Sequence, residues 1–109
     1  MYKLSVLYGH PTDPAAFDHY YYEKHIPLAS KMPGLLGWTI GKCESTAAGE
    51  KPAFYLIVAL YGESRQSLEA TIDSPEGQAA VADLANFATG GATFMFDNEE
   101  VILPVSLNR

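Results

Sequence analysis

The sequence has a single cysteine, Cys43, and no long apolar run. One thiol excludes an internal disulfide and is typical of a protein in a reducing compartment. No window approaches the roughly 20 apolar residues that a membrane-spanning helix needs. The residues after Met1 do not form a charged leader followed by an apolar stretch. We therefore expect a cytoplasmic protein that does not bind membranes.

Positive charge is also scarce. Seven lysines and arginines stand against 13 aspartates and glutamates, so the net charge is −6, and there is no basic run. This balance argues against nucleic acid as a partner. The three histidines lack the spacing of metal ligands and have no cysteine partner nearby, so we predict no metal site. No glycine-rich phosphate loop is present, and we predict no cofactor. No serine elbow is present either, so a serine nucleophile is not indicated.

The remaining composition is that of an ordered globular protein. Of 109 residues, 48% are hydrophobic and 18% are charged, which predicts one domain over residues 1–109. Periodicity predicts strand, helix, strand, strand, helical region and strand, at residues 2–9, 13–25, 35–43, 54–61, 64–89 and 93–103. Within the last strand, residues 97–100 are expected to form a bend. This order indicates an α+β fold, the ferredoxin-like βαββαβ sandwich with a four-stranded antiparallel sheet.

The third predicted strand, residues 54–61, is apolar on both of its faces. Two helices can cover only one face of a four-stranded sheet, so the other face would expose a large apolar patch. The simplest solution is a homodimer in which a second copy packs sheet against sheet. We expect the even-numbered strand residues to face the helices, since Tyr8 and Trp38 share that parity.

The first predicted helix organises the candidate site. Asp13 can cap its first amides and Pro14 suits its first turn. Phe17, Tyr21 and His25 are spaced four residues apart, so their side chains lie along one face. Pro27 removes an amide hydrogen, and we expect the regular helix to end near His25.

This region also resembles the signature of a known family. The matching residues are Asp13-Pro14, Phe17, Tyr20-Tyr21, His25-Ile26-Pro27-Leu28 and Pro33-Gly34. They resemble the EthD family of the dimeric α+β barrel superfamily. The resemblance implies ferredoxin-like chains that pair through their sheets and enclose a cavity. It fixes no substrate, although the family name is associated with ether breakdown beside an oxygenase system.

We predict a cleft between the sheet and the helices, which would be the default small-molecule site. His25 is the candidate general acid or base, since imidazole titrates near neutrality, and Tyr21 could orient it or hold an oxyanion. The predicted substrate-binding residues are Tyr8, His10, Phe17, Leu28, Trp38 and Ile40. The competing interpretation is structural: His25 would cap the end of its helix by bonding a backbone carbonyl.

Three functions remain open from the sequence. The first is a cofactor-independent enzyme acting on a small apolar or aromatic carbonyl-bearing molecule, in a degradation or oxidation pathway. Related barrels imply oxygenase, isomerase or lyase chemistry without choosing among them. The second is a non-catalytic binding or accessory protein that partners an oxygenase system. The third is a haem-binding barrel with His25 as axial ligand and with Lys24 and Lys31 near the propionates.

Overall fold

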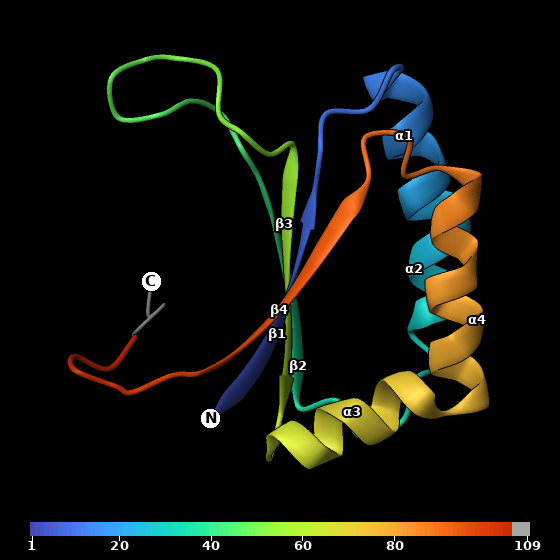
Figure 1. The fold of residues 1–109 in the computed structure, drawn as a ribbon, viewed down its shortest axis with the longest axis vertical. Coiled ribbons are helices and arrows are strands. Elements are labelled where there is room, and N and C mark those ends of the chain that lie inside the picture. Colours follow the sequence, from blue (N-terminus) through green and yellow to red (C-terminus); the bar gives the residue numbers. More distant parts are fainter. Residues whose placement is uncertain (106–109) are drawn as a thin grey trace.

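A four-stranded antiparallel sheet forms one layer of the molecule and the helices form the other (Figure 1). The structure is a computed structural model and describes residues 1–105. The strands are β1 (Tyr2–Tyr8), β2 (Gly37–Lys42), β3 (Leu56–Gly62) and β4 (Ala92–Asn98). Their order across the sheet is β2-β3-β1-β4. This order, with helices between β1 and β2 and between β3 and β4, confirms the predicted ferredoxin-like fold.

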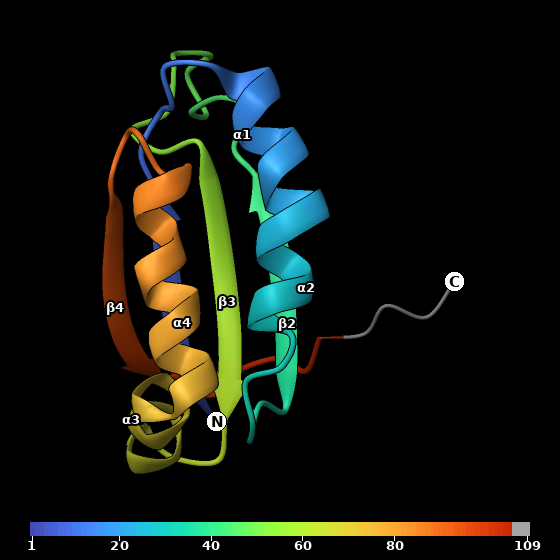
Figure 2. The same ribbon diagram turned by 90° about the vertical axis from the view of Figure 1, so that its right-hand side faces the viewer.

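The helical layer has two parts, and their longer helices lie side by side over the sheet (Figure 2). The first contains α1 (Pro14–Tyr20), the π-helical turn η1 (Tyr21–His25) and α2 (Ile26–Ala29). The second contains α3 (Arg65–Asp73), α4 (Pro75–Asp83) and the 3₁₀ turn η2 (Leu84–Asn86). Asp13 caps α1 through its side-chain oxygen, as the sequence predicts, and Ser64 and Ser74 cap α3 and α4 in the same way. None of the described helices has the length and apolar character needed to cross a bilayer.

The first helix does not end near His25, contrary to the sequence-based expectation. It continues past Pro27 to Ala29, and the Ser30 amide donates to the Ile26 carbonyl at 2.8 Å. The turn before the proline is π-helical, with the Ile26 amide bonded to the Tyr21 carbonyl. A wider turn is one way to accommodate proline, which lacks a hydrogen-bond donor and crowds the preceding turn. His25 therefore lies inside a continuous helical segment.

The even-numbered strand residues face the helices, as predicted. In β1, Leu4, Val6 and Tyr8 are buried in the core. They pair across the sheet with even-numbered residues of β3, which are buried as well. The third strand begins at Leu56, two residues later than the sequence suggests.

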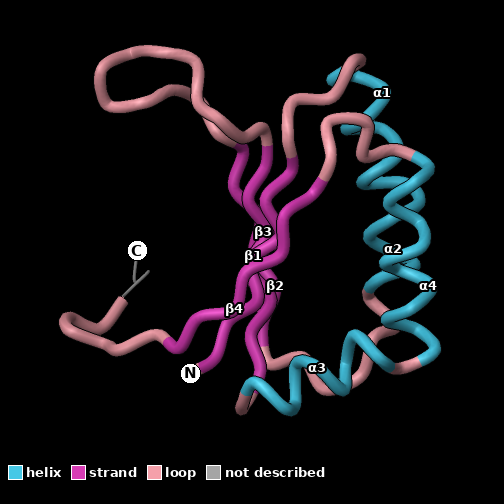
Figure 3. The backbone as a smooth tube through the Cα atoms, in the orientation of Figure 1, coloured by secondary structure: helices cyan, strands magenta, loops and turns pink. Residues whose placement is uncertain are grey.

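The opposite face of the sheet carries no helix (Figure 3). Ile57 on β3 is 41% exposed on this face, and Met95 on β4 is 50% exposed. The 43–55 loop and the segment after β4 both extend on this side of the sheet in Figures 1 and 3. Residues 101–103 do not form the predicted continuation of the last strand; they are exposed and have no strand pairing.

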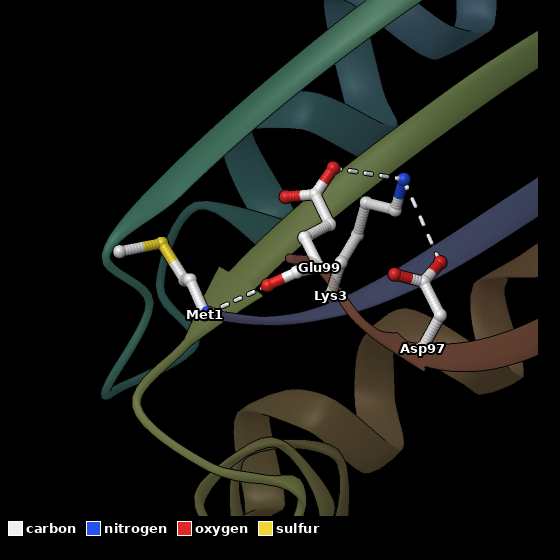
Figure 4. A network of polar contacts seen from close by, with 4 residues as sticks. All are labelled: Met1, Lys3, Asp97 and Glu99. Carbon is white, nitrogen blue, oxygen red and sulfur yellow. Dashed lines mark hydrogen bonds and ion pairs between the residues drawn. The ribbon is translucent and has the colours of Figure 1, made fainter. Parts of the chain in front are cut away.

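Polar contacts join the start of β1 to the end of β4 (Figure 4). Lys3 Nζ lies 3.3 Å from Glu99 Oε2 and 3.5 Å from Asp97 Oδ2. The Glu99 amide also donates to the Met1 carbonyl at 3.0 Å. Burial opposes the charge on Lys3, but the two carboxylates outweigh it and raise the pKa of Lys3. These contacts join the two strands at the end of the sheet where Tyr2 pairs with Asn98.

Candidate functional site

A histidine–carboxylate pair lies between the two parts of the helical layer. His25 comes from η1 and Asp83 is the last residue of α4. His25 Nδ1 and Asp83 Oδ2 are 2.9 Å apart, and their side chains are only 7% and 9% exposed. Because a carboxylate can only accept, Nδ1 carries the hydrogen in this bond. Neutral His25 then has its lone pair on Nε2, which is the form needed to accept a proton.

Two further donors hold the Asp83 carboxylate. Tyr20 donates its hydroxyl hydrogen to Asp83 Oδ1 at 2.6 Å, and Asn86 Nδ2 donates to the same oxygen at 3.0 Å. Burial opposes ionisation of Asp83, but the hydrogen bonds from Tyr20, Asn86 and His25 outweigh it and lower the pKa of this carboxyl. Asp83 is therefore a carboxylate at neutral pH, and it fixes both the tautomer and the orientation of His25.

Aromatic rings surround the imidazole. The His25 ring centre is 4.7 Å from that of Phe87 and 5.4 Å from that of Tyr21. Tyr21 stacks on Phe17 at 5.9 Å, and Tyr8 meets Tyr21 edge to face at 6.0 Å. Such packing excludes water and leaves the imidazole little freedom to rotate.

The free side of this cluster opens on a cavity of about 40 Å³ between the sheet and the helices. That volume holds about three water molecules, so a larger ligand requires the lining side chains to move. Met32, with its flexible thioether chain, is the most adaptable of them. The cavity is lined by Val6, Tyr8, Tyr21, His25, Ala29, Met32, Trp38, Val58, Leu60, Ile72, Ala80, Val81, Leu84 and Phe94.

Only a few polar atoms reach this apolar cavity. Burial raises the pKa of Tyr21 to about 12, and the neighbouring Trp38 indole opposes that rise only in part. Burial also raises the pKa of Tyr8, with the negative charge of Asp83 adding to it. Both hydroxyls are thus protonated at neutral pH and can donate hydrogen bonds. Trp38 Nε1 is buried without a hydrogen-bond partner among the described residues, a situation that costs about 1–3 kcal/mol.

A larger groove lies next to the cavity, against α3 and β4. Its volume is about 430 Å³, and its walls include Leu4, Phe96 and the acidic residues Glu69 and Asp73. Ile72 and Phe94 line both the groove and the cavity. These two shared side chains therefore separate the groove from the space beside His25.

The structure brings four of the predicted site residues to one cavity. They come from β1, η1 and β2, and they are Tyr8, Tyr21, His25 and Trp38. Their chemical roles stay predictions, because shared position alone does not establish catalysis. The proposed helix-capping role for His25 is wrong, since its Nδ1 bonds the Asp83 side chain instead of a backbone carbonyl.

The other four predicted residues do not line the cavity. Phe17 is buried among the aromatic rings behind it, and Ile40 packs against the core on the same sheet face. Leu28 is half-buried on α2. His10 Nε2 lies 2.8 Å from the Pro52 carbonyl oxygen, so this histidine holds two loops together. A substrate-binding role for these four residues stays a prediction.

Sequence reasoning missed Asp83 and Phe87. Helical spacing in the sequence indicates a stripe through Val81, Leu84, Ala85 and Ala88. The structure buries Ala80, Asp83 and Phe87 most deeply. Leu84 and Ala88 are partly buried against the core, whereas Val81 and Ala85 are exposed. The available signal was Phe87, a large aromatic four residues after a carboxylate. Helical spacing places these two side chains on one face, but it does not reveal the partner of the carboxylate.

A second carboxylate cluster lies outside the cavity. Tyr55 donates to Asp18 Oδ1 at 2.8 Å, and Lys42 forms an ion pair with Asp18 Oδ2. Burial opposes ionisation of Asp18, but these two donors outweigh it and lower its pKa. The cluster joins α1 to β2 and to the residue that precedes β3. Across residues 1–105, no three His, Cys, Asp or Glu side chains are grouped closely enough to hold a metal ion.

Comparison with known proteins identifies the family. The EthD domain profile matches residues 9–91. An uncharacterized 11.0 kDa protein in the thcB-thcC intergenic region of Rhodococcus erythropolis is 46% identical, covering 95% of this chain and 100% of its own. An EthD family crystal structure from Bacillus halodurans is 35% identical, covers 92% and 99% of the two chains, and has a TM-score of 0.85. An EthD-like structure from Ralstonia eutropha is 24% identical, covers 96% and 95%, and has a TM-score of 0.72. The chain therefore belongs to the EthD family.

Proposed function

We propose that this protein is a cofactor-independent enzyme that moves a proton to or from a small, mostly apolar, carbonyl-bearing substrate. His25 is the general acid and base. The observation that carries this proposal is the hydrogen bond between His25 Nδ1 and Asp83, at 2.9 Å in a buried setting. It leaves Nε2 as the nitrogen available to a molecule in the cavity.

The proton transfer requires only the substrate and His25. His25 Nε2 takes a proton from the carbon next to the substrate carbonyl, and the electrons of that C–H bond move to the carbonyl oxygen as an enolate. The imidazolium that forms lies against the Asp83 carboxylate, which stabilises its charge. Returning the proton to a different carbon, or passing the enolate to another reagent, would complete isomerase, lyase or oxygenase chemistry.

The haem alternative receives no support from the described residues. None of the side chains that line the cavity is a lysine or arginine able to pair with propionates. Lys24 and Lys31 are both exposed.

We also propose that two copies pair through the open sheet face to form a dimeric α+β barrel. The support is the helix-free face with Ile57 and Met95 exposed on it. Soluble proteins seldom leave a continuous apolar patch uncovered. Pairing would cover this face and leave each cavity, which lies on the opposite side of the sheet, within its own subunit.

The test is α-proton exchange of a small ketone, butanone, in heavy water, followed by NMR. The wild-type protein should accelerate exchange, and the exchange rate should be at least about a hundredfold lower with His25→Ala. His19→Ala is the matched control, because His19 is an exposed histidine on the same helical segment, and it should retain the full rate. A protein that binds butanone without accelerating exchange would be the non-catalytic binder, and the enzyme proposal would fail.

A further inference from the structure

The indole N–H of Trp38 is the one buried side-chain polar group that lacks a partner within residues 1–105. Trp38 belongs to β2, and its side chain lines the same cavity as His25. Buried polar groups in folded proteins are nearly always hydrogen-bonded. An indole can only donate, so the partner that this site calls for is an acceptor, and the cavity is where such a partner can lie.

Tyr21 places a second donor beside the indole. The Trp38 N–H is near enough to Tyr21 Oη to influence that hydroxyl, although the geometry falls short of a hydrogen bond. Tyr21 also lines the cavity and stays protonated at neutral pH, since burial raises its pKa to about 12. Trp38, Tyr21 and His25, which supply two donors and one base, therefore line the same apolar space.

We propose that Trp38 Nε1–H and Tyr21 O–H together bind the carbonyl oxygen of the substrate and stabilise it as an enolate oxygen. This assignment rests on the proposed function, in which His25 takes the neighbouring C–H proton. The Trp38 hydrogen bond is then made to the ligand and not to the protein. Donors fixed in advance at the position where negative charge develops are an effective means of lowering such a barrier.

The charges of the site narrow the substrate class. Among the described residues that line the cavity there is no lysine or arginine, and the Asp83 carboxylate lies directly behind His25. A substrate that arrives as a carboxylate or phosphate would meet negative charge without a cation to balance it. A neutral ketone or β-dicarbonyl enters without this penalty, and proton transfer then creates an enolate and an imidazolium together. The substrate class is therefore a small neutral carbonyl compound with an acidic C–H beside the carbonyl group.

Acetylacetone is a suitable probe, because its enolate and neutral forms have different ultraviolet spectra. The wild-type protein should bind it and raise the enolate fraction of the bound molecule at neutral pH. Trp38→Phe keeps an aromatic ring but removes the N–H, and it should weaken binding by about tenfold and lower the enolate fraction. Tyr21→Phe should do the same. Tyr22→Phe is the control, because Tyr22 is 51% exposed, and it should bind as the wild type does.

Binding is measured without turnover, so this result is independent of the exchange test. In a His25→Ala background the Trp38→Phe change should still weaken acetylacetone binding, because the hydrogen bond does not need the base. If His25→Ala keeps its exchange rate while Trp38→Phe weakens binding, the base assignment fails and the oxygen site stands. The oxygen site is overturned if the wild type does not bind acetylacetone, or if both Trp38→Phe and Tyr21→Phe bind it unchanged. Circular dichroism checks that each variant folds. If Trp38→Phe does not fold, the binding result for Tyr21→Phe tests the oxygen site.

Discussion

Asp83 Oδ2 accepts a hydrogen bond from His25 Nδ1 at 2.9 Å, although 58 residues separate the two in the sequence. This contact joins the end of α4 to the π-helical turn of the first helical segment. Because the carboxylate fixes the imidazole tautomer, the chemistry of Nε2 depends on a residue that never touches the cavity side of the ring. Asp83 is thus a positioning residue, and its role can be separated from that of His25.

Replacing Asp83 with asparagine should lower kcat for ketone proton exchange by at least about tenfold, with little change in KM. The amide keeps the size of the carboxylate but loses the charge that stabilises the imidazolium. The measurement is steady-state exchange of butanone by NMR. Asp18→Asn is the matched control, since Asp18 is also held by a tyrosine but bonds Tyr55 and Lys42 and not His25. Equal losses in both variants would assign the effect to stability and not to His25.

The Asp83 carboxyl should also make the protein sensitive to acid. Its pKa is lowered in the folded state, because hydrogen bonds outweigh the effect of burial. A lowered pKa contributes stability above the unfolded value of about 3.9, and this contribution is lost as pH falls through the folded value. The melting temperature should therefore fall steeply below about pH 4, and less steeply in Asp83→Asn. Asp18, whose pKa is also lowered, should contribute a second, separate part of this fall in melting temperature.

Thermal melts between acidic and neutral pH measure both contributions. The double variant Asp83→Asn with Asp18→Asn should have the shallowest dependence of melting temperature on pH. The two sites have no shared hydrogen-bond partner among their recorded bonds, so their effects should add. A double variant with the wild-type slope would contradict the assignment of acid sensitivity to these carboxyls.

The fold could be predicted because its signals are local. Alternation in β1 places Leu4, Val6 and Tyr8 on one face whatever the rest of the chain does. The four-residue spacing of Tyr21 and His25 likewise places both side chains on the cavity face. Such periodic patterns need no knowledge of distant residues.

The centre of the site could not be predicted in the same way. Asp83 becomes buried only because α4 packs beside the first helical segment, and that contact is not encoded in any local spacing. Pro27 was expected to end a helix, since proline lacks a donor, but tertiary packing and the π-helical turn keep the helix intact to Ala29. Local rules thus placed His25 on the buried face of its helix and missed the residue that orients it.

Access to the cavity should depend on Phe94. This side chain lines both the outer groove and the inner cavity and is 39% exposed. Phe94→Ala should widen the passage and lower KM for cyclohexanone relative to butanone by about tenfold, the scale that one or two methylene groups contribute in an apolar pocket. Phe96→Ala is the control, because Phe96 lines only the groove. If the ratio of the KM for cyclohexanone to the KM for butanone is unchanged in Phe94→Ala, the entrance lies elsewhere.

Pairing through the open sheet face can be tested at Ile57. This residue lies on β3, faces away from the helices and is 41% exposed in the single chain. Aspartate at this position would place an unpaired charge in the interface, a cost of at least about 3 kcal/mol, or more than a hundredfold in the dimer Kd. Wild type should sediment as a dimer and Ile57→Asp as a folded monomer. Tyr22→Asp carries the same new charge on the helical side, and it should remain dimeric. A dimer that survives Ile57→Asp but is lost in Tyr22→Asp would move the interface to the helices.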